Sequence, residues 1–106
     1  MAEESKYTVD YFIKKFEAIP SFRWTTGKTT EYFGFRRCAI GHCIQFTKYS
    51  QQSLHNLFYI NLGPHITVAG VNDHGTEKYC NIETPKERIL AALHDIKKKL
   101  DNTEKT

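Results

Sequence analysis

Hydrophobic and polar residues alternate with a helical period near the start of the chain. Across residues 9–19, charged side chains occupy the positions between a set of apolar ones. Thr8 is well placed as an N-cap, and Pro20 disfavours helical geometry in the residue before it. The pattern therefore predicts an amphipathic helix, and its buried face consists of Val9, Phe12, Ile13, Phe16 and Ile19.

A second periodic segment, residues 84–100, carries the clearest helix signals in the chain. Thr84 as N-cap, Pro85 at the first helical position and Glu87 two residues later complete a capping box. The predicted buried stripe is Ile89, Leu93, Ile96 and Leu100. This stripe can pack against the chain's own core or against a partner chain. We expect residues 1–6 and 101–106 to be flexible ends.

The middle of the chain is harder to interpret. Residues 50–63 favour a helix, with Leu54, Leu57 and Phe58 facing inward and Gly63 ending it. Residues 37–46 fit both a helical and a strand period, and we favour the helix. Residues 64–71 can form a helix opened by a proline or a short strand. The sequence "NDHG" at 72–75 predicts a turn with a glycine at positive φ.

Between the first two helices the sequence is aromatic and rich in threonine. Residues 23–26 and 30–35 can pair as a short hairpin with "TGKT" as its turn. Trp24 is most simply an anchor of the core, since it offers a large apolar area and one N–H that needs a partner.

Composition agrees with a folded single domain. The chain has 106 residues, which is too few for two domains of usual size. Of these residues 40% are hydrophobic and 25% are charged, as in folded globular proteins. We predict an α+β fold that is predominantly helical: a single compact domain, residues 1–106 with a core from about 8 to 100, of about four helices and a short aromatic hairpin or loop.

Charge and cysteine content narrow the classes of function. A formal net charge of +3 is small for a protein that binds nucleic acid by its phosphates. The acidic, polar start does not resemble a signal peptide, and no stretch has the roughly 20 apolar residues that cross a bilayer. Three cysteines, an odd number, fit reduced thiols, so we expect a cytoplasmic protein.

Three short motifs carry a resemblance to a known family. In this order the chain has "CAIGHC", "VND" and "TPKERILAAL". With Trp24, this arrangement resembles a family of small uncharacterised bacterial and phage proteins, to which no activity is assigned. The resemblance implies a mostly helical domain of bacterial, phage or mobile-element origin, and it transfers no catalytic residue. The matching positions are Trp24, Cys38, Ala39, Gly41, Asn72, Asp73, Thr84, Pro85 and Leu93.

The segment "RRCAIGHC" holds two cysteines and a histidine close together. On a helix Cys43 shares a face with Ala39 and Phe46 and is expected in the core, whereas Cys38, Gly41 and His42 lie on the other side. We predict that this side lines a ligand-binding pocket without chemistry. Its candidate residues are Trp24, Tyr32, Cys38, His42, Asn72, Asp73 and His74. Taken alone, Asn72 and Asp73 are better explained by local turn bonds.

Two chemical alternatives use the same cysteine. Cys38 at a helix N-terminus can act as a nucleophile with His65 as base, which would make the protein a cysteine hydrolase. Cys38, His42 and Cys80 can supply part of a zinc site, for which His65 or His74 would complete the ligands. Neither alternative has the flanking motif that usually accompanies it.

A third alternative is binding of single-stranded nucleic acid, in which basic and aromatic side chains alternate on one surface. The residues concerned are Arg23, Lys28, Arg36, Arg37 and Lys48 with Trp24, Tyr32, Phe33 and Tyr49. We favour a small, cytoplasmic, non-catalytic binding protein that needs no cofactor and recognises a small ligand or a protein partner. A homo-oligomer is compatible with the sequence.

Overall fold

The computed structural model describes residues 9–26, 30–31, 36–39, 41–42 and 50–105. Helices dominate, as predicted, and the elements follow in the order α2 (Val9–Glu17), the 3-10 turn η1 (Ser21–Arg23), β1 (Thr30–Glu31), β2 (Arg36–Arg37), α4 (Ser50–Leu62), α5 (Val68–Asp73), α6 (Thr76–Tyr79) and α7 (Pro85–Lys105). The two strands have two residues each, so they form no sheet layer and do not establish an α+β fold.

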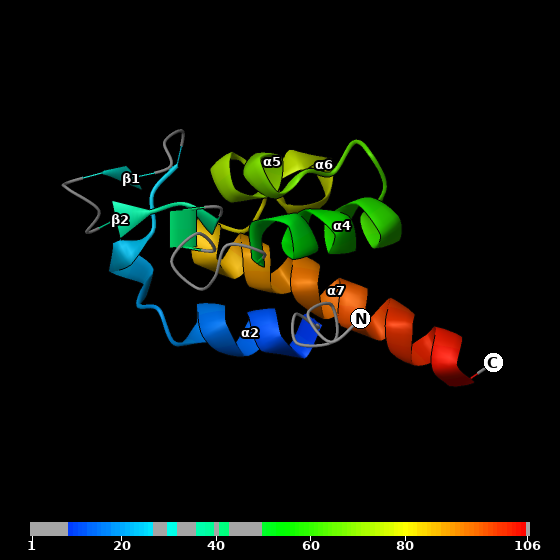
Figure 1. Cartoon of the computed structure of the whole chain (residues 1–106). Coiled ribbons are helices and arrows are strands. Elements are labelled where there is room, and N and C mark those ends of the chain that lie inside the picture. Colours follow the sequence, from blue (N-terminus) through cyan, green and yellow to red (C-terminus); the bar gives the residue numbers. More distant parts are fainter. Residues whose placement is uncertain (1–8, 27–29, 32–35, 40, 43–49, 106) are drawn as a thin grey trace.

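Helix α7 is the centre of the fold. Helices α2, α4 and α5 all pack against it, with α2 on one side and α4 and α5 on the other (Figure 1). The predicted stripe of α7 lies in this chain's own core, since Ile89, Leu93 and Ile96 are fully buried. Leu100, the fourth residue of the predicted stripe, is partly buried against the same core. The remaining core side chains come mainly from α2, α4 and α5: Val9, Phe12, Ile13, Phe16, Leu54, Phe58, Val68 and Val71.

The strongly periodic helices lie where the sequence predicts them. The inward face of α2 is buried as expected from Val9 to Phe16, but the helix ends at Glu17, so that Ile19 lies beyond it and is partly buried. Thr8, the predicted cap, lies outside the described residues. At the start of α7 the Thr84 hydroxyl accepts the Glu87 N–H at 3.2 Å, the first half of the capping box. The helix then continues to Lys105, five residues beyond its predicted end.

The segment after α4 is a turn followed by a helix. Helix α4 ends on Gly63, which has a φ of +103°, as predicted. Thr67, not Pro64, opens the next helix, because its hydroxyl accepts the Gly70 N–H at 3.0 Å. The predicted turn at 72–75 is confirmed in its second half, where Gly75 has the expected positive φ of +85°, but Asn72 and Asp73 belong to the last turn of α5.

The aromatic segment forms a hairpin in a different register from the predicted one. Strand β1 pairs with β2, Thr30 opposite Arg37, whereas the prediction paired residues 23–26 with 30–35. Trp24 instead makes a parallel bridge to Arg37, and the Thr25 N–H donates to the Arg37 carbonyl at 3.0 Å. The cause is burial of Trp24, whose indole N–H donates to the Ile19 carbonyl at 3.3 Å and holds this segment against α2.

The favoured helix over residues 37–46 is confirmed in part: Arg37 belongs to strand β2 and Cys38 to no element, and helical geometry begins at Ala39. Ala39, Gly41 and His42 have helical geometry, and the His42 N–H donates to the Cys38 carbonyl at 2.9 Å. Cys43 and Phe46, which the sequence places in the core, lie outside the described residues. Among the helices that the structure describes, none is both long and apolar enough to cross a membrane.

Candidate binding site

Asn72 is the residue on which the predicted cluster converges. Its side chain is fully buried, and its Oδ1 accepts the Ala39 N–H at 3.0 Å. Ala39 begins the central helix, our name for the helical segment whose described residues are Ala39, Gly41 and His42, so this N–H is one of those that have no partner within the helix. Its Nδ2 donates to the Thr25 carbonyl and to Asp73 Oδ1, both at 2.9 Å. Asn72 therefore does not act through a local turn. It connects α5 to two segments that lie 33 and 47 residues earlier in the chain.

Arg88 of α7 completes this junction from the other side. Its buried guanidinium donates only to backbone carbonyls: Nε to Val71 at 2.9 Å and Nη2 to Asn72 at 2.6 Å. Nη1 reaches the carbonyls of Ile82 and Glu83 at 2.9 and 3.0 Å. The positive charge meets the negative end of α5, which offsets part of its desolvation cost. Arg88 thus closes the C-terminus of α5 and fixes the loop before α7.

Cys38 and His42 are also part of the interior. The Cys38 sulfur accepts the Gly41 N–H at 3.5 Å, so it serves as the N-cap of the central helix. The His42 ring lies 4.9 Å from the Trp24 ring, and its Nε2 bonds the Arg23 carbonyl at 3.0 Å. Burial lowers the pKa of His42 to about 4, with a smaller contribution from the Arg23 and Arg37 charges. The ring is therefore neutral at pH 7 and donates from Nε2.

The structure brings four of the seven predicted pocket residues together, in a closed environment. Trp24, Cys38, His42 and Asn72 are each less than 10% exposed. Asp73 is half-buried beside Asn72, His74 is exposed at the end of α5, and Tyr32 lies outside the described residues. The polar groups of this cluster bond one another and the backbone, so the arrangement stabilises the fold.

The residues of the two chemical alternatives are not brought together. His65 is exposed in the turn between α4 and α5, on the opposite side of Figure 1 from β2, which Cys38 follows directly. Cys80 is exposed after α6, where its thiol donates to the Glu77 carbonyl at 3.6 Å. Over the described ranges, no three His, Cys, Asp or Glu side chains are placed to hold a metal ion.

The nucleic-acid alternative loses its central aromatic residue. Trp24 is 1% exposed, so no base can stack on it. Arg23 and Arg37 are partly exposed beside it. The side chain of Arg36 is not described. The other residues of that prediction lie outside the described part of the chain: Lys28, Tyr32, Phe33, Lys48 and Tyr49.

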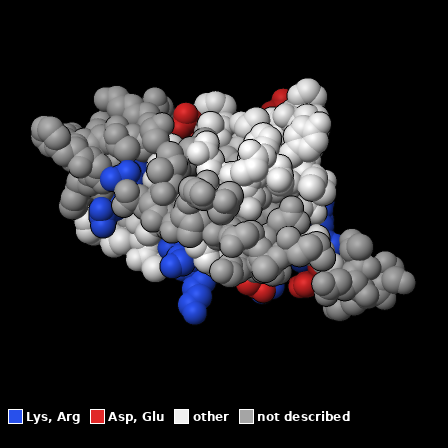
Figure 2. Space-filling view, viewed as in Figure 1, with Lys and Arg blue, Asp and Glu red and all other residues white. Residues whose placement is uncertain are grey.

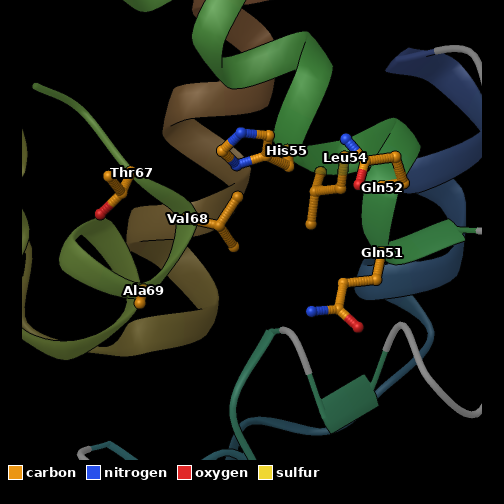
Figure 3. A pocket seen from close by; sticks show the side chains of 7 residues that line it. All are labelled: Gln51, Gln52, Leu54, His55, Thr67, Val68 and Ala69. Atoms are coloured by element: carbon orange, nitrogen blue, oxygen red, sulfur yellow. The ribbon is translucent and has the colours of Figure 1, made fainter. Parts of the chain in front are cut away.

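A pocket that the sequence prediction missed lies between α4 and the start of α5 (Figure 3). It has a volume of about 320 Å³. Leu54 and Val68 point toward each other from the two helices, with the His55 ring and the Gln51 amide on either side of them. The remaining lining residues are Gln52, Thr67 and Ala69. None of the seven is Lys, Arg, Asp or Glu.

The chain segment that forms this pocket is also free of Lys, Arg, Asp and Glu. Between Lys48 and Asp73 the chain has 24 consecutive residues without Lys, Arg, Asp or Glu, where its 25% content of charged residues would place about six. We call the exposed side of α4 the α4 face: Gln51, Gln52, His55, Asn56, Tyr59 and Ile60. Tyr59 and Ile60 are 56% and 77% exposed, and this part of the molecule is largely white in Figure 2.

The signal for this surface was present in the sequence, as the long gap between charged residues. It is easily missed because a helix is usually identified by its inward residues, here Leu54 and Phe58. A scan against models of protein families and searches of curated proteins and of solved structures gave no match for this chain.

Proposed function

We propose that this protein is a non-catalytic binding protein and that it recognises its ligand or partner through the α4 face. The observation that carries the proposal is the uncharged surface on α4 and the turn to α5, which exposes Tyr59 and Ile60 beside a pocket. The site differs from the one predicted from the sequence, because Trp24 and Asn72 face inward.

An uncharged surface suits binding for an energetic reason. Charged side chains lose hydration when a partner covers them, and that cost often equals the attraction gained. The α4 face has no such cost, and large exposed side chains such as Tyr59 and Ile60 favour contact by burial of apolar area. Tyrosine is also one of the residues enriched among those that dominate binding energy.

The proposal includes no catalytic step. Cys38 caps a helix and is buried, and His65 belongs to a distant turn, so the proposal assigns neither of them to a reaction. The free thiols of Cys38 and Cys80 support the cytoplasm as the compartment in which the protein acts. The proposal keeps a bacterial or phage origin as what the family resemblance implies.

Nuclear magnetic resonance can test the location of the site. A library of small charged and uncharged fragments is titrated into ¹⁵N-labelled protein, and amide shifts are followed for every residue. We expect uncharged fragments to shift the amide signals of residues 50–69. Ile60→Lys should weaken the binding of those fragments that contact the α4 face outside the pocket. Shifts confined to residues 23–42, or none anywhere, would contradict the proposal.

A further inference from the structure

The pocket beside the α4 face combines an apolar floor with two unengaged polar groups. Leu54 and Val68 are buried at its base. The Gln51 amide makes no hydrogen bond within the described part of the chain, and neither does the His55 imidazole. By contrast, Gln52 donates to Asn56 Oδ1 at 3.0 Å. Gln51 and His55 therefore have their full hydrogen-bonding capacity available to a ligand.

The shape of these groups selects a flat ligand with a polar edge. A carboxamide presents one donor and one acceptor side by side, and it matches the edge of a nucleobase, most directly that of adenine. The His55 ring lies 6.1 Å from the Tyr59 ring at 31°, so Tyr59 supports it as one wall. The floor of Leu54 and Val68 offers apolar contact to the faces of a ring.

The size of the pocket and the charge of its lining narrow the class of ligand further. A pocket of about 320 Å³ is at the small end of ligand sites, which is enough for one base but not for a dinucleotide. Phosphate groups are bound most strongly by Arg and Lys side chains, and none of the seven described lining residues is Arg or Lys. The base should therefore enter from an uncharged nucleoside.

We infer that the pocket between α4 and α5 binds the base of an uncharged nucleoside, with adenine as the best fit, through the Gln51 amide and the His55 ring. This inference rests on the proposed function, since it names a ligand class for the same surface. It assigns Gln51 and His55 as binding residues and leaves the junction around Asn72 to the fold.

The test uses adenosine as the probe, with uridine, adenosine 5′-monophosphate and a short oligoadenylate as comparators. Dissociation constants are measured by NMR titration of the full chain at about 50 and 300 mM salt. A neutral site predicts little change in the adenosine constant between these salts, whereas phosphate-dominated binding weakens steeply. We expect adenosine to bind at least as tightly as its monophosphate.

Two matched variants localise the ligand. Gln51→Glu removes the amide donor and adds a charge in the pocket, and a carboxylate in the first turn of α4 is compatible with the helix dipole. Asn61→Asp makes the same amide-to-carboxylate change on the same helix, outside both the α4 face and the residues that line the pocket. We expect Gln51→Glu to weaken adenosine binding about tenfold and Asn61→Asp to change it less than about twofold, since only the first removes a polar contact to the ligand.

The outcomes separate this inference from the proposed function. Absence of adenosine binding, equal effects of the two variants, or tighter, salt-dependent binding of the oligonucleotide would overturn the nucleoside assignment. Other uncharged fragments binding at residues 50–69 would then still support the α4 face as the binding surface. Failure of all fragments there would remove both.

Discussion

Replacement of Asn72 by alanine tests whether this residue holds the fold together. The change removes the acceptor of the Ala39 N–H and a donor to the Thr25 carbonyl, and both residues are at most 5% exposed. A buried polar group left without its partner costs about 1–3 kcal/mol, so we expect Asn72→Ala to lower the free energy of unfolding by about 2–5 kcal/mol. That is a large part of the roughly 5–15 kcal/mol that a domain has.

Urea denaturation followed by Trp24 fluorescence measures this loss, and calorimetry gives the melting temperature. For a domain of this size we expect a fall of about 8–40 °C in Tm, at about 4–8 °C for each kcal/mol. Asn61→Ala is the control, because the Asn61 amide bonds only the Leu57 carbonyl one turn earlier on α4. It should cost less than about 1 kcal/mol. Equal losses for the two variants, both below that value, would refute the structural role of Asn72.

Three further predictions concern the pH dependence, the glycines and the thiols. The pKa of His42 is lowered to about 4 in the folded chain and is near 6.5 in the unfolded chain, so its contribution to the free energy of unfolding should be complete above about pH 6.5 and decline toward pH 4. Denaturation curves of His42→Gln at several pH values should show a smaller dependence of stability on pH. Gly63→Ala should lower the free energy of unfolding by about 1–2 kcal/mol for its positive φ alone. Gly75→Ala should lower it more, because the new Cβ would lie 2.6 Å from backbone atoms. Similar losses of stability for the two variants in urea denaturation would contradict this. Mass spectrometry after brief iodoacetamide treatment should find Cys80 alkylated before Cys38, whereas faster labelling of Cys38 would revive the hydrolase alternative.

The parts of the fold that the sequence predicted depend on local signals. Helices α2 and α7 have a regular apolar period, and α7 also has a capping residue, Thr84, within the same turn. Such signals act between residues three or four positions apart, so they are visible in the sequence. The same holds for Gly63, whose positive φ ends α4.

The parts that could not be predicted depend on partners far away in the chain. The local interpretation of Asn72 as a turn residue was reasonable, but its side chain bonds residues that only the folded chain brings near. Arg88 follows two charged residues and reads as a solvated side chain, yet it lies one turn before the buried Ala92 and bonds four carbonyls. The predicted hairpin register was wrong for the same reason, because burial of Trp24 in the core determines which residues pair with its segment.

The junction around Asn72 also constrains the order of folding. Closing it joins residue 72 to residues 25 and 39, and the loop-closure entropy must be offset by contacts that form at the same time. The bonds from Asn72 to Thr25 and Ala39 can therefore form only when α5 holds Asn72 in its native place. One amide should report this event: Ala39, at a helix start where hydrogen exchange is normally fast, should exchange with solvent only when the whole domain unfolds.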